Sequence, residues 1–193
     1  HKHSNSLKEK GTRLNSFLLR NKGIDIRWNI ETKVKDSGIV VGADQGLLTV
    51  LTLSDSQVTD DTCIHGHSLK SILQKMCSQK RGSKAFKRSQ SHRTNFINAS
   101  INKLDFSDIK QINLERIWNI GHKNKSSNLL SHWTNTTIRD KVMSKAIKDG
   151  VHLIEQDSTY RSQRCSCCGM VRKNNRKGKT YTCYGCGYIG DAD

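Results

Sequence analysis

Residues 165–193, CSCCGMVRKNNRKGKTYTCYGCGYIGDAD, contain two Cys-x-x-Cys pairs and end in acidic residues. Cys165 and Cys168 form the first pair, Cys183 and Cys186 form the second, and 14 residues separate the pairs. Zinc accepts four thiolates in a tetrahedron, and the two-residue spacing lets one tight turn direct two sulfurs at the same ion. The gap lies just short of the roughly 15 to 20 residues typical of zinc ribbons. The stretch therefore predicts a structural Zn²⁺ site.

The other features of the cysteines agree with a metal site. Gly169 and Gly187 follow the two pairs, where a turn that directs its amides at sulfur favours positive φ. The alternative is a set of disulfides or incidental cysteines, but an odd count of seven and the lack of a visible signal peptide argue against a secreted disulfide framework. Cys167 has no role in this pattern, and Cys63 and Cys77 are expected to be small buried residues rather than ligands.

The charge balance predicts a polyanionic partner. Lysine and arginine number 33 against 17 acidic residues, which gives a net charge of +16. Such an excess favours nucleic acid over a merely soluble basic surface. No apolar run approaches the roughly 18 residues of a membrane span, so we expect no membrane partner and a cytoplasmic, nucleoid-associated protein. Because the chain begins with His1 and stops at Asp193, we also expect a C-terminal fragment.

Two groups of basic residues are candidates for phosphate contact. One surrounds a predicted break between two helices, and the other lies between the cysteine pairs. A charge run is often only a solvated face, but here it belongs to a strongly basic chain. The first group is Lys80, Arg81, Lys84, Lys87, Arg88 and Arg93, and the second is Arg172, Lys173, Arg176 and Lys177.

Hydrophobic periodicity predicts an α/β fold in which a sheet with flanking helices carries the zinc module near its end. Residues 24–30 alternate as a half-buried strand does, whereas residues 39–41 form a β-branched run typical of a strand buried on both faces. A hairpin is expected to turn at Gly46. The remaining expected elements are two helices from about Ser68, a strand at 109–117, a helix at 132–148 that stops at Gly150, and a final buried strand at 151–154.

Three acids stand at expected strand or loop ends: Asp44, Glu115, and Asp193 or Asp191. Magnesium prefers hard oxygen ligands, and two such ions can activate water and stabilise the leaving oxygen of a phosphodiester. Taken alone, Asp44 in its Gly-x-Asp-x-Gly turn is more often a turn residue than a ligand. Three convergent carboxylates would suffice to hold a pair of ions.

Five segments, in the same order, resemble the C-terminal half of the TnpB family, transposon-encoded RNA-guided nucleases related to type V CRISPR effectors. Residues 41–46 (VGADQG) resemble the first RuvC motif and residues 113–115 (NLE) the second. Residues 82–84 (GSK) resemble the start of the family's inter-motif helix. Residues 160–169 (YRSQRCSCCG) resemble the entry to its zinc ribbon, although Arg161 replaces the usual Thr, and residues 186–193 (CGYIGDAD) resemble the exit into the third motif.

The resemblance implies an RNase H-like (RuvC) nuclease with an inserted zinc ribbon. It implies a missing upstream domain ending in 1–37, a nuclease core at 38–160, the ribbon at 161–189 and the third motif from 190–193. Asp44, Glu115 and Asp193 would bind two Mg²⁺ or Mn²⁺ ions, and the partners would be DNA and a guide RNA. The alternatives are a catalytically inactive nucleic-acid-binding remnant and a guide-independent, structure-specific nuclease.

Overall fold

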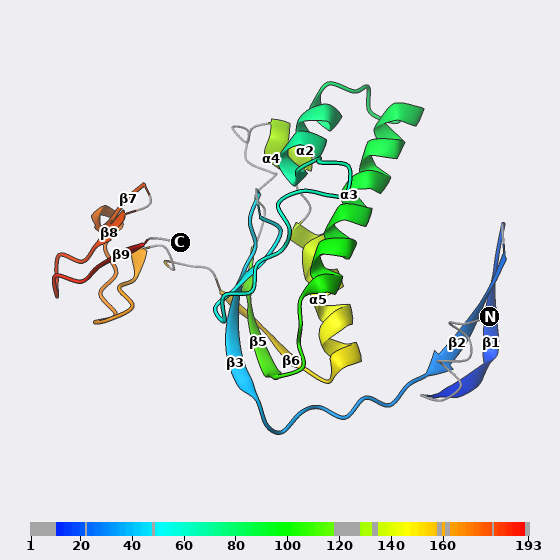
Figure 1. The fold of residues 1–193 in the computed structure, drawn as a ribbon, viewed down its shortest axis with the longest axis horizontal. Coiled ribbons are helices and arrows are strands. Elements are labelled where there is room, and N and C mark those ends of the chain that lie inside the picture. Colours follow the sequence, from blue (N-terminus) through cyan, green and yellow to red (C-terminus); the bar gives the residue numbers. More distant parts are fainter. Residues whose placement is uncertain are drawn as a thin grey trace.

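The computed structural model describes residues 11–21, 23–47, 49–117, 128–132, 135–157, 160, 163–178 and 180–191 (Figure 1). Its strands form three sheets: a two-stranded hairpin, a four-stranded sheet that carries the helices, and a three-stranded ribbon. The hairpin contains β1 (Thr12–Arg20) and β2 (Gly23–Asn29). The ribbon contains β7 (Arg176–Lys177), β8 (Thr180–Thr182) and β9 (Ile189–Asp191), preceded by a 3₁₀ turn at Lys173–Asn175.

The central sheet has the strand order β4-β3-β5-β6. Strands β3 (Ile39–Asp44), β5 (Ile109–Arg116) and β6 (His152–Asp157) are parallel, and the short β4 (Thr52–Leu53) runs antiparallel to β3. Parallel neighbours require crossover connections, and helices supply both of them. The predicted α/β class is therefore confirmed.

The hairpin after β3 is shorter than predicted. Only Thr52 and Leu53 pair with β3, whereas Val50 and Leu51 are fully buried outside any strand. The backbone of Leu51 is satisfied elsewhere, because its amide donates to Thr59 Oγ1 at 3.0 Å and its carbonyl accepts from the Thr59 amide at 3.0 Å. The apolar run thus forms a core-filling loop, since hydrogen bonds to Thr59 replace a strand ladder.

The helices begin where serine caps them. Helix α2 (Leu69–Cys77) has Ser68 as N-cap, and helix α3 (Lys84–Lys103) has Ser83 as N-cap; each serine side chain accepts the amide three residues on at 3.1 Å. The predicted pair of helices and the break near residues 81–83 are confirmed. Among the described helices, none is long and apolar enough to cross a membrane.

Helix α5 (Asn135–Asp149) follows the short α4 (Asn128–His132). It begins three residues after the predicted start at residue 132. One face of the helix, formed by Ile138, Val142 and Ala146, is fully buried. Gly150 ends the helix at φ +68°, and a Cβ there would lie 2.4 Å from the Lys33 carbonyl oxygen. Glycine is needed at this stop both for its dihedral and for the close approach of the preceding chain.

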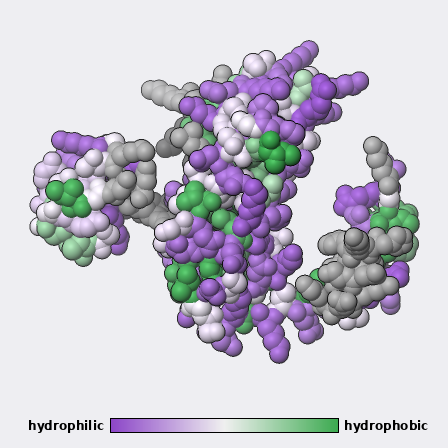
Figure 2. All heavy atoms as spheres, in the orientation of Figure 1, coloured by the Kyte–Doolittle hydropathy of each residue, from purple (hydrophilic) through white to green (hydrophobic). Residues whose placement is uncertain are grey.

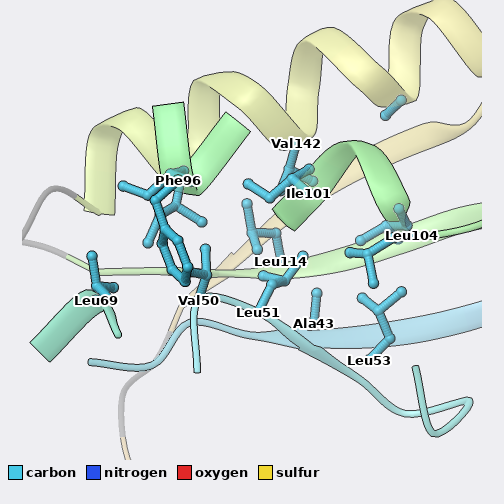
Figure 3. Packing of buried hydrophobic residues seen from close by; sticks show 14 of the residues in the cluster. Ala43, Val50, Leu51, Leu53, Leu69, Phe96, Ile101, Leu104, Leu114 and Val142 are labelled. Carbon is cyan, nitrogen blue, oxygen red and sulfur yellow. The ribbon is translucent and has the colours of Figure 1, made fainter. Parts of the chain in front are cut away.

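The core lies between one face of the sheet and helices α2, α3 and α5. Figure 3 shows Ile101 of α3, Val142 of α5 and Leu114 of β5 meeting in this layer, and all three are fully buried. The opposite face of β5 carries Gln111 and Asn113, which hydrogen-bond to each other at 2.9 Å. One sheet face is thus apolar and covered, whereas the other carries polar side chains on β5.

Two burial predictions for the sheet are wrong for this reason. Val41 is buried, but Val40 is 50% exposed, so β3 is buried on one face rather than on both. In the final strand Val151 is buried, whereas Leu153 and Ile154 are only half-buried, because β6 lies at the edge of the sheet. A short β-branched run does not itself indicate how many faces are covered.

The hairpin β1–β2 differs most from expectation. Residues 12–20 form a strand rather than a tail, and β2 is exposed except for the half-buried Trp28. Leu19 is 70% exposed, and Figure 2 shows hydrophobic side chains on the surface of this hairpin. The segment after it is attached to the core, because Lys35 Nζ donates to the carbonyls of Phe106 and Ser107 at 2.6 and 2.7 Å.

Candidate functional site

The four predicted zinc ligands converge. The Sγ atoms of Cys165, Cys168, Cys183 and Cys186 all lie within 4.8 Å of one another. Two of the sulfur pairs, Cys165–Cys186 and Cys168–Cys183, are 3.6 Å apart. Four sulfurs bound to one tetrahedral zinc at about 2.3 Å would stand roughly 3.8 Å apart. The donor set and its spacing therefore fit Zn²⁺.

Matching hydrogen bonds build the two cysteine turns. Gly169 N donates to the Cys165 carbonyl at 3.0 Å, and Gly187 N donates to the Cys183 carbonyl at 3.0 Å. These glycines have φ of +74° and +73°, which confirms the predicted dihedrals. The amides of Cys165 and Cys183 in turn donate to the carbonyls five residues on, both at 2.8 Å. The two halves thus present their sulfurs in the same way.

The sulfurs differ in proton affinity. The backbone amide of Cys186 lowers the pKa of the Cys183 thiol to about 6, with help from the amide of Gly185. The amide of Tyr188 lowers the pKa of Cys186, but burial and the neighbouring thiols outweigh it and raise that pKa to about 12. Four adjacent thiols cannot all ionise without a cation among them, so binding zinc must release protons.

A buried polar pair supports the ribbon, and the sequence analysis missed it. Asn175 is fully buried, and its Nδ2 donates to Tyr181 Oη at 3.0 Å. The Tyr181 hydroxyl donates to the Gln163 carbonyl at 3.3 Å, and Asn175 Oδ1 accepts the Tyr184 amide at 3.4 Å. Asn174 and Asn175 are adjacent in the sequence, and only contacts show which of the two faces inward.

The remaining cysteines lie outside this group. Cys167 is exposed, as expected of a residue with no ligand role. Cys63 is half-buried and packs against the main core. Cys77 is exposed, so its predicted burial is wrong; it is the last residue of helix α2 and follows the buried Met76.

Two of the three predicted acids stand on adjacent strands. Ala43 of β3 is in register with Leu114 of β5, and Asp44 and Glu115 follow them at the carboxyl ends of these parallel strands. Neighbouring strands lie about 4.8 Å apart, so the two residues stand side by side at this edge of the sheet. Asp44 is exposed and Glu115 is half-buried. Asp193 lies outside the described residues, while Asp191 ends β9, where its backbone pairs with Thr180.

Neighbouring side chains stabilise this edge of the sheet. Gln45 is buried, and its Nε2 donates to the Glu115 carbonyl at 3.1 Å, which ties the end of β3 to the end of β5. Glu155 of β6 forms ion pairs of 3.6 Å with Arg116 and with Arg139. Sequence reasoning missed both residues, although Gln45 lies within the Gly-rich motif that drew attention to Asp44.

The predicted basic group around the helix break is exposed with one exception. Lys80, Arg81, Lys84, Lys87 and Arg88 are all exposed, on or just before the first turns of α3. Arg93 is only 9% exposed, and its Nη1 donates to the His132 carbonyl. This guanidinium joins α3 to α4, and its burial argues against the predicted phosphate contact of Arg93.

The second basic group lies in the ribbon. Arg172, Lys173 and Lys177 are exposed, while Arg176 is half-buried and donates from Nε to the Gly178 carbonyl at 3.0 Å. The Arg172 guanidinium stands 5.6 Å from the centre of the Tyr184 ring, within cation–π range. Arg172 and Tyr184 thus bring a cation and an aromatic face together on the ribbon surface.

Comparison with known proteins gives related sequences and a related fold. Residues 136–193 match the family model described as Cas12f1-like, TNB domain. The CRISPR-associated endodeoxyribonuclease Cas12f1 of Sulfoacidibacillus thermotolerans is 37% identical over 83 residues, or 42% of this chain and 19% of that protein. The Cas12f1 of Syntrophomonas palmitatica is 30% identical over 126 residues, or 64% of this chain and 24% of that protein.

The solved structures include a cryo-EM structure of a Cas12f1–sgRNA–target DNA complex, with a TM-score of 0.52 at 15% identity. That alignment covers 78% of this chain and 35% of the Cas12f1 chain, and it shows a shared fold. The predicted resemblance to relatives of the type V CRISPR effectors is confirmed. The chain spans about a fifth to a quarter of the curated relatives that it matches.

Proposed function

We propose that this chain is the nuclease region of an RNA-guided DNA endonuclease, with an RNase H-like (RuvC) core and a zinc-bound ribbon. The observation that carries the proposal is the placement of Asp44 and Glu115 at the ends of adjacent parallel strands. The sequence similarity to Cas12f1 endodeoxyribonucleases supports the class of reaction.

In this proposal Asp44, Glu115 and Asp193 hold two Mg²⁺ or Mn²⁺ ions. Bound in pairs, such ions activate water and stabilise the leaving oxygen in phosphodiester hydrolysis. The protein residues supply hard oxygen ligands and fix their spacing, and the Gln45 contact to the Glu115 carbonyl holds the two strand ends in register. The half-buried position of Glu115 restricts the orientations that its carboxylate adopts.

The exposed basic residues on α3 and on the ribbon hold the nucleic acid backbone. Lysine and arginine contacts to phosphate position a duplex or a hybrid without reading its sequence, and base pairing to a guide RNA supplies the sequence specificity. Figure 2 shows a largely hydrophilic surface over the helices. DNA and a guide RNA are therefore the proposed partners.

The experiment measures Mg²⁺-dependent DNA cleavage and DNA binding in parallel. Asp44→Ala, Glu115→Ala and Asp193→Ala should each abolish cleavage and leave DNA binding nearly unchanged. Asp61→Ala removes an exposed carboxylate outside the site and is the matched control, and Asp191→Ala tests which C-terminal acid is the third ligand.

Mn²⁺ binding by calorimetry adds a readout that does not require turnover. Loss of Mn²⁺ binding in Asp44→Ala and Glu115→Ala, with Asp61→Ala unchanged, supports the site. If the parent chain binds DNA but neither binds Mn²⁺ nor cuts, the binding-remnant alternative replaces the proposal. Cleavage that is indifferent to a guide RNA would favour the structure-specific nuclease.

A further inference from the structure

A tight turn before helix α2 carries three residues able to bind a metal. Residues 63–67 read Cys-Ile-His-Gly-His. The Cys63 amide donates to the His67 carbonyl at 2.9 Å, and the Gly66 amide donates to the Cys63 carbonyl at 2.8 Å. These bonds close the turn and fix the backbone that carries Cys63, His65 and His67.

Helix α3 brings a fourth such residue to this turn. His92 Nε2 lies 3.5 Å from Cys63 Sγ, and the rings of His67 and His92 meet edge to face with centroids 5.5 Å apart. A sulfur and an imidazole nitrogen bound to one tetrahedral zinc stand roughly 3.5 Å apart, and two zinc-bound imidazole rings have centroids roughly 5 Å apart. Both spacings therefore match those of ligands that share an ion.

The cluster is accessible. His65 and His92 line a hollow of about 510 Å³ and an adjoining one of about 350 Å³, and Cys63 lines the second. His65 and His67 are exposed to solvent.

We propose that Cys63, His65, His67 and His92 bind a second zinc ion, separate from the ribbon. Cys63 and His92 already stand at ligand spacing, and the site requires the exposed His65 and His67 to turn their rings toward them. One thiolate with three imidazoles is a donor set that suits zinc. The ion would fasten the turn to α3, next to Lys87 and Arg88 of the basic surface.

Two basic side chains beside the proposed site oppose the binding of a metal. Lys87 and Arg88 line the same hollow, and positive charge there weakens the attraction for any cation. An anion such as phosphate is the competing ligand for this hollow, so the test must separate the two.

The test is the zinc content of the purified chain after dialysis against excess zinc, measured by atomic emission. We expect about two equivalents in the parent and in Cys77→Ser, which removes an exposed cysteine outside both sites. Cys63→Ser and His92→Gln should each retain about one equivalent, as should the ribbon variant Cys183→Ser. In the Cys183→Ser background, Co²⁺ should give a thiolate charge-transfer band that Cys63→Ser removes.

The two sites are thereby distinguished within one chain. Circular dichroism of His92→Gln and Cys63→Ser checks that the helices are intact, so that loss of one equivalent reports the site rather than unfolding. One equivalent in the parent, or two in Cys63→Ser, overturns the proposal. Inorganic phosphate that raises the melting temperature of Cys183→Ser, where zinc leaves it unchanged, would assign the hollow to an anion and also overturn it.

Discussion

Two isoleucines on helix α5 differ in how much their side chains contribute to stability. Ile138 is fully buried against the sheet, whereas Ile147 is 60% exposed. Truncating a buried isoleucine removes its burial energy and leaves a cavity, so Ile138→Ala should lower the free energy of unfolding by about 2–5 kcal/mol. Ile147→Ala on the same helix should change it by less than about 0.5 kcal/mol. Urea denaturation of both variants measures the difference, and equal losses would contradict the described packing.

The burial of Arg93 could be inferred from its helical spacing, although its charge suggested an exposed side chain. Phe86, Ser89, Arg93, Phe96 and Ile97 share the buried face of α3, and Arg93 falls at the helical interval on both sides. Its charge led to a prediction of phosphate contact, although its position in the stripe indicated burial. What the sequence could not supply is the acceptor, because the His132 carbonyl comes from a different helix.

His132 makes stability depend on pH. Burial lowers its pKa, and the charges of Arg81 and Arg93 lower it further. Because the folded state binds this proton less readily than the unfolded chain, stability is complete above the ordinary pKa of about 6.5 and falls as the pH drops through the lower folded value. The loss between pH 7 and 5 should be smaller in His132→Gln than in the parent. Chemical denaturation across that range measures it, and parallel pH profiles would contradict the assignment.

At the scale of the element, the N-cap of α3 contributes to the stability of the fold in a way that can be measured separately. Ser83 Oγ accepts the Phe86 amide at 3.1 Å at the start of a 20-residue helix. Ser83→Ala should lower the free energy of unfolding by about 0.5–2 kcal/mol. Ser91→Ala, on the exposed face of the same helix, should be neutral or slightly stabilising, because alanine has the higher helix propensity. Thermal denaturation followed at 222 nm compares them, and a neutral Ser83→Ala would contradict the cap.

The ribbon should respond to zinc as a unit of its own. Its buried hydrophobic centre consists of Cys165, Cys183 and Tyr181, a cluster too small to hold a fold without metal. Cys183→Ser should therefore remove the dispersed amide resonances of Tyr181 and Gly187 and leave those of the central sheet in place. Cys167→Ser, at an exposed cysteine, should change neither. NMR of labelled protein tests this, and an intact ribbon in Cys183→Ser would show that zinc is dispensable.

Elements with local signals were predictable, and those that depend on partners were not. Hydrophobic periodicity indicated α2, α3 and α5. Strand β1 was missed because residues 12–20 lack clean alternation and are ordered by pairing with β2. Similarly, two acids of the site could be placed at strand ends from sequence, but the contact of Gln45 across to β5 depends on the order of the strands.

For the whole molecule, the charge of +16 predicts binding that weakens steeply with salt. Replacing Lys84, Lys87 and Arg88 with glutamine should reduce the slope of log affinity against log salt by about 0.7–0.9 for each lost phosphate contact. Replacing Lys110, Lys141 and Lys148 removes the same charge elsewhere and should change the slope less. Fluorescence anisotropy with a labelled DNA at several salt concentrations measures both. Equal slopes in the two triple variants would mean that net charge, rather than the α3 surface, governs binding.

The parallel pairing of β3 with β5 also sets an order of events during synthesis. Seventy residues separate Gln45 from the Glu115 carbonyl that it contacts. At roughly 5–20 residues per second, the first acid waits several seconds on the ribosome before the second has been made. In that interval β3 has only the two-residue β4 beside it in the sheet. The nascent chain is therefore open to misassembly until β5 has been made and pairs with β3.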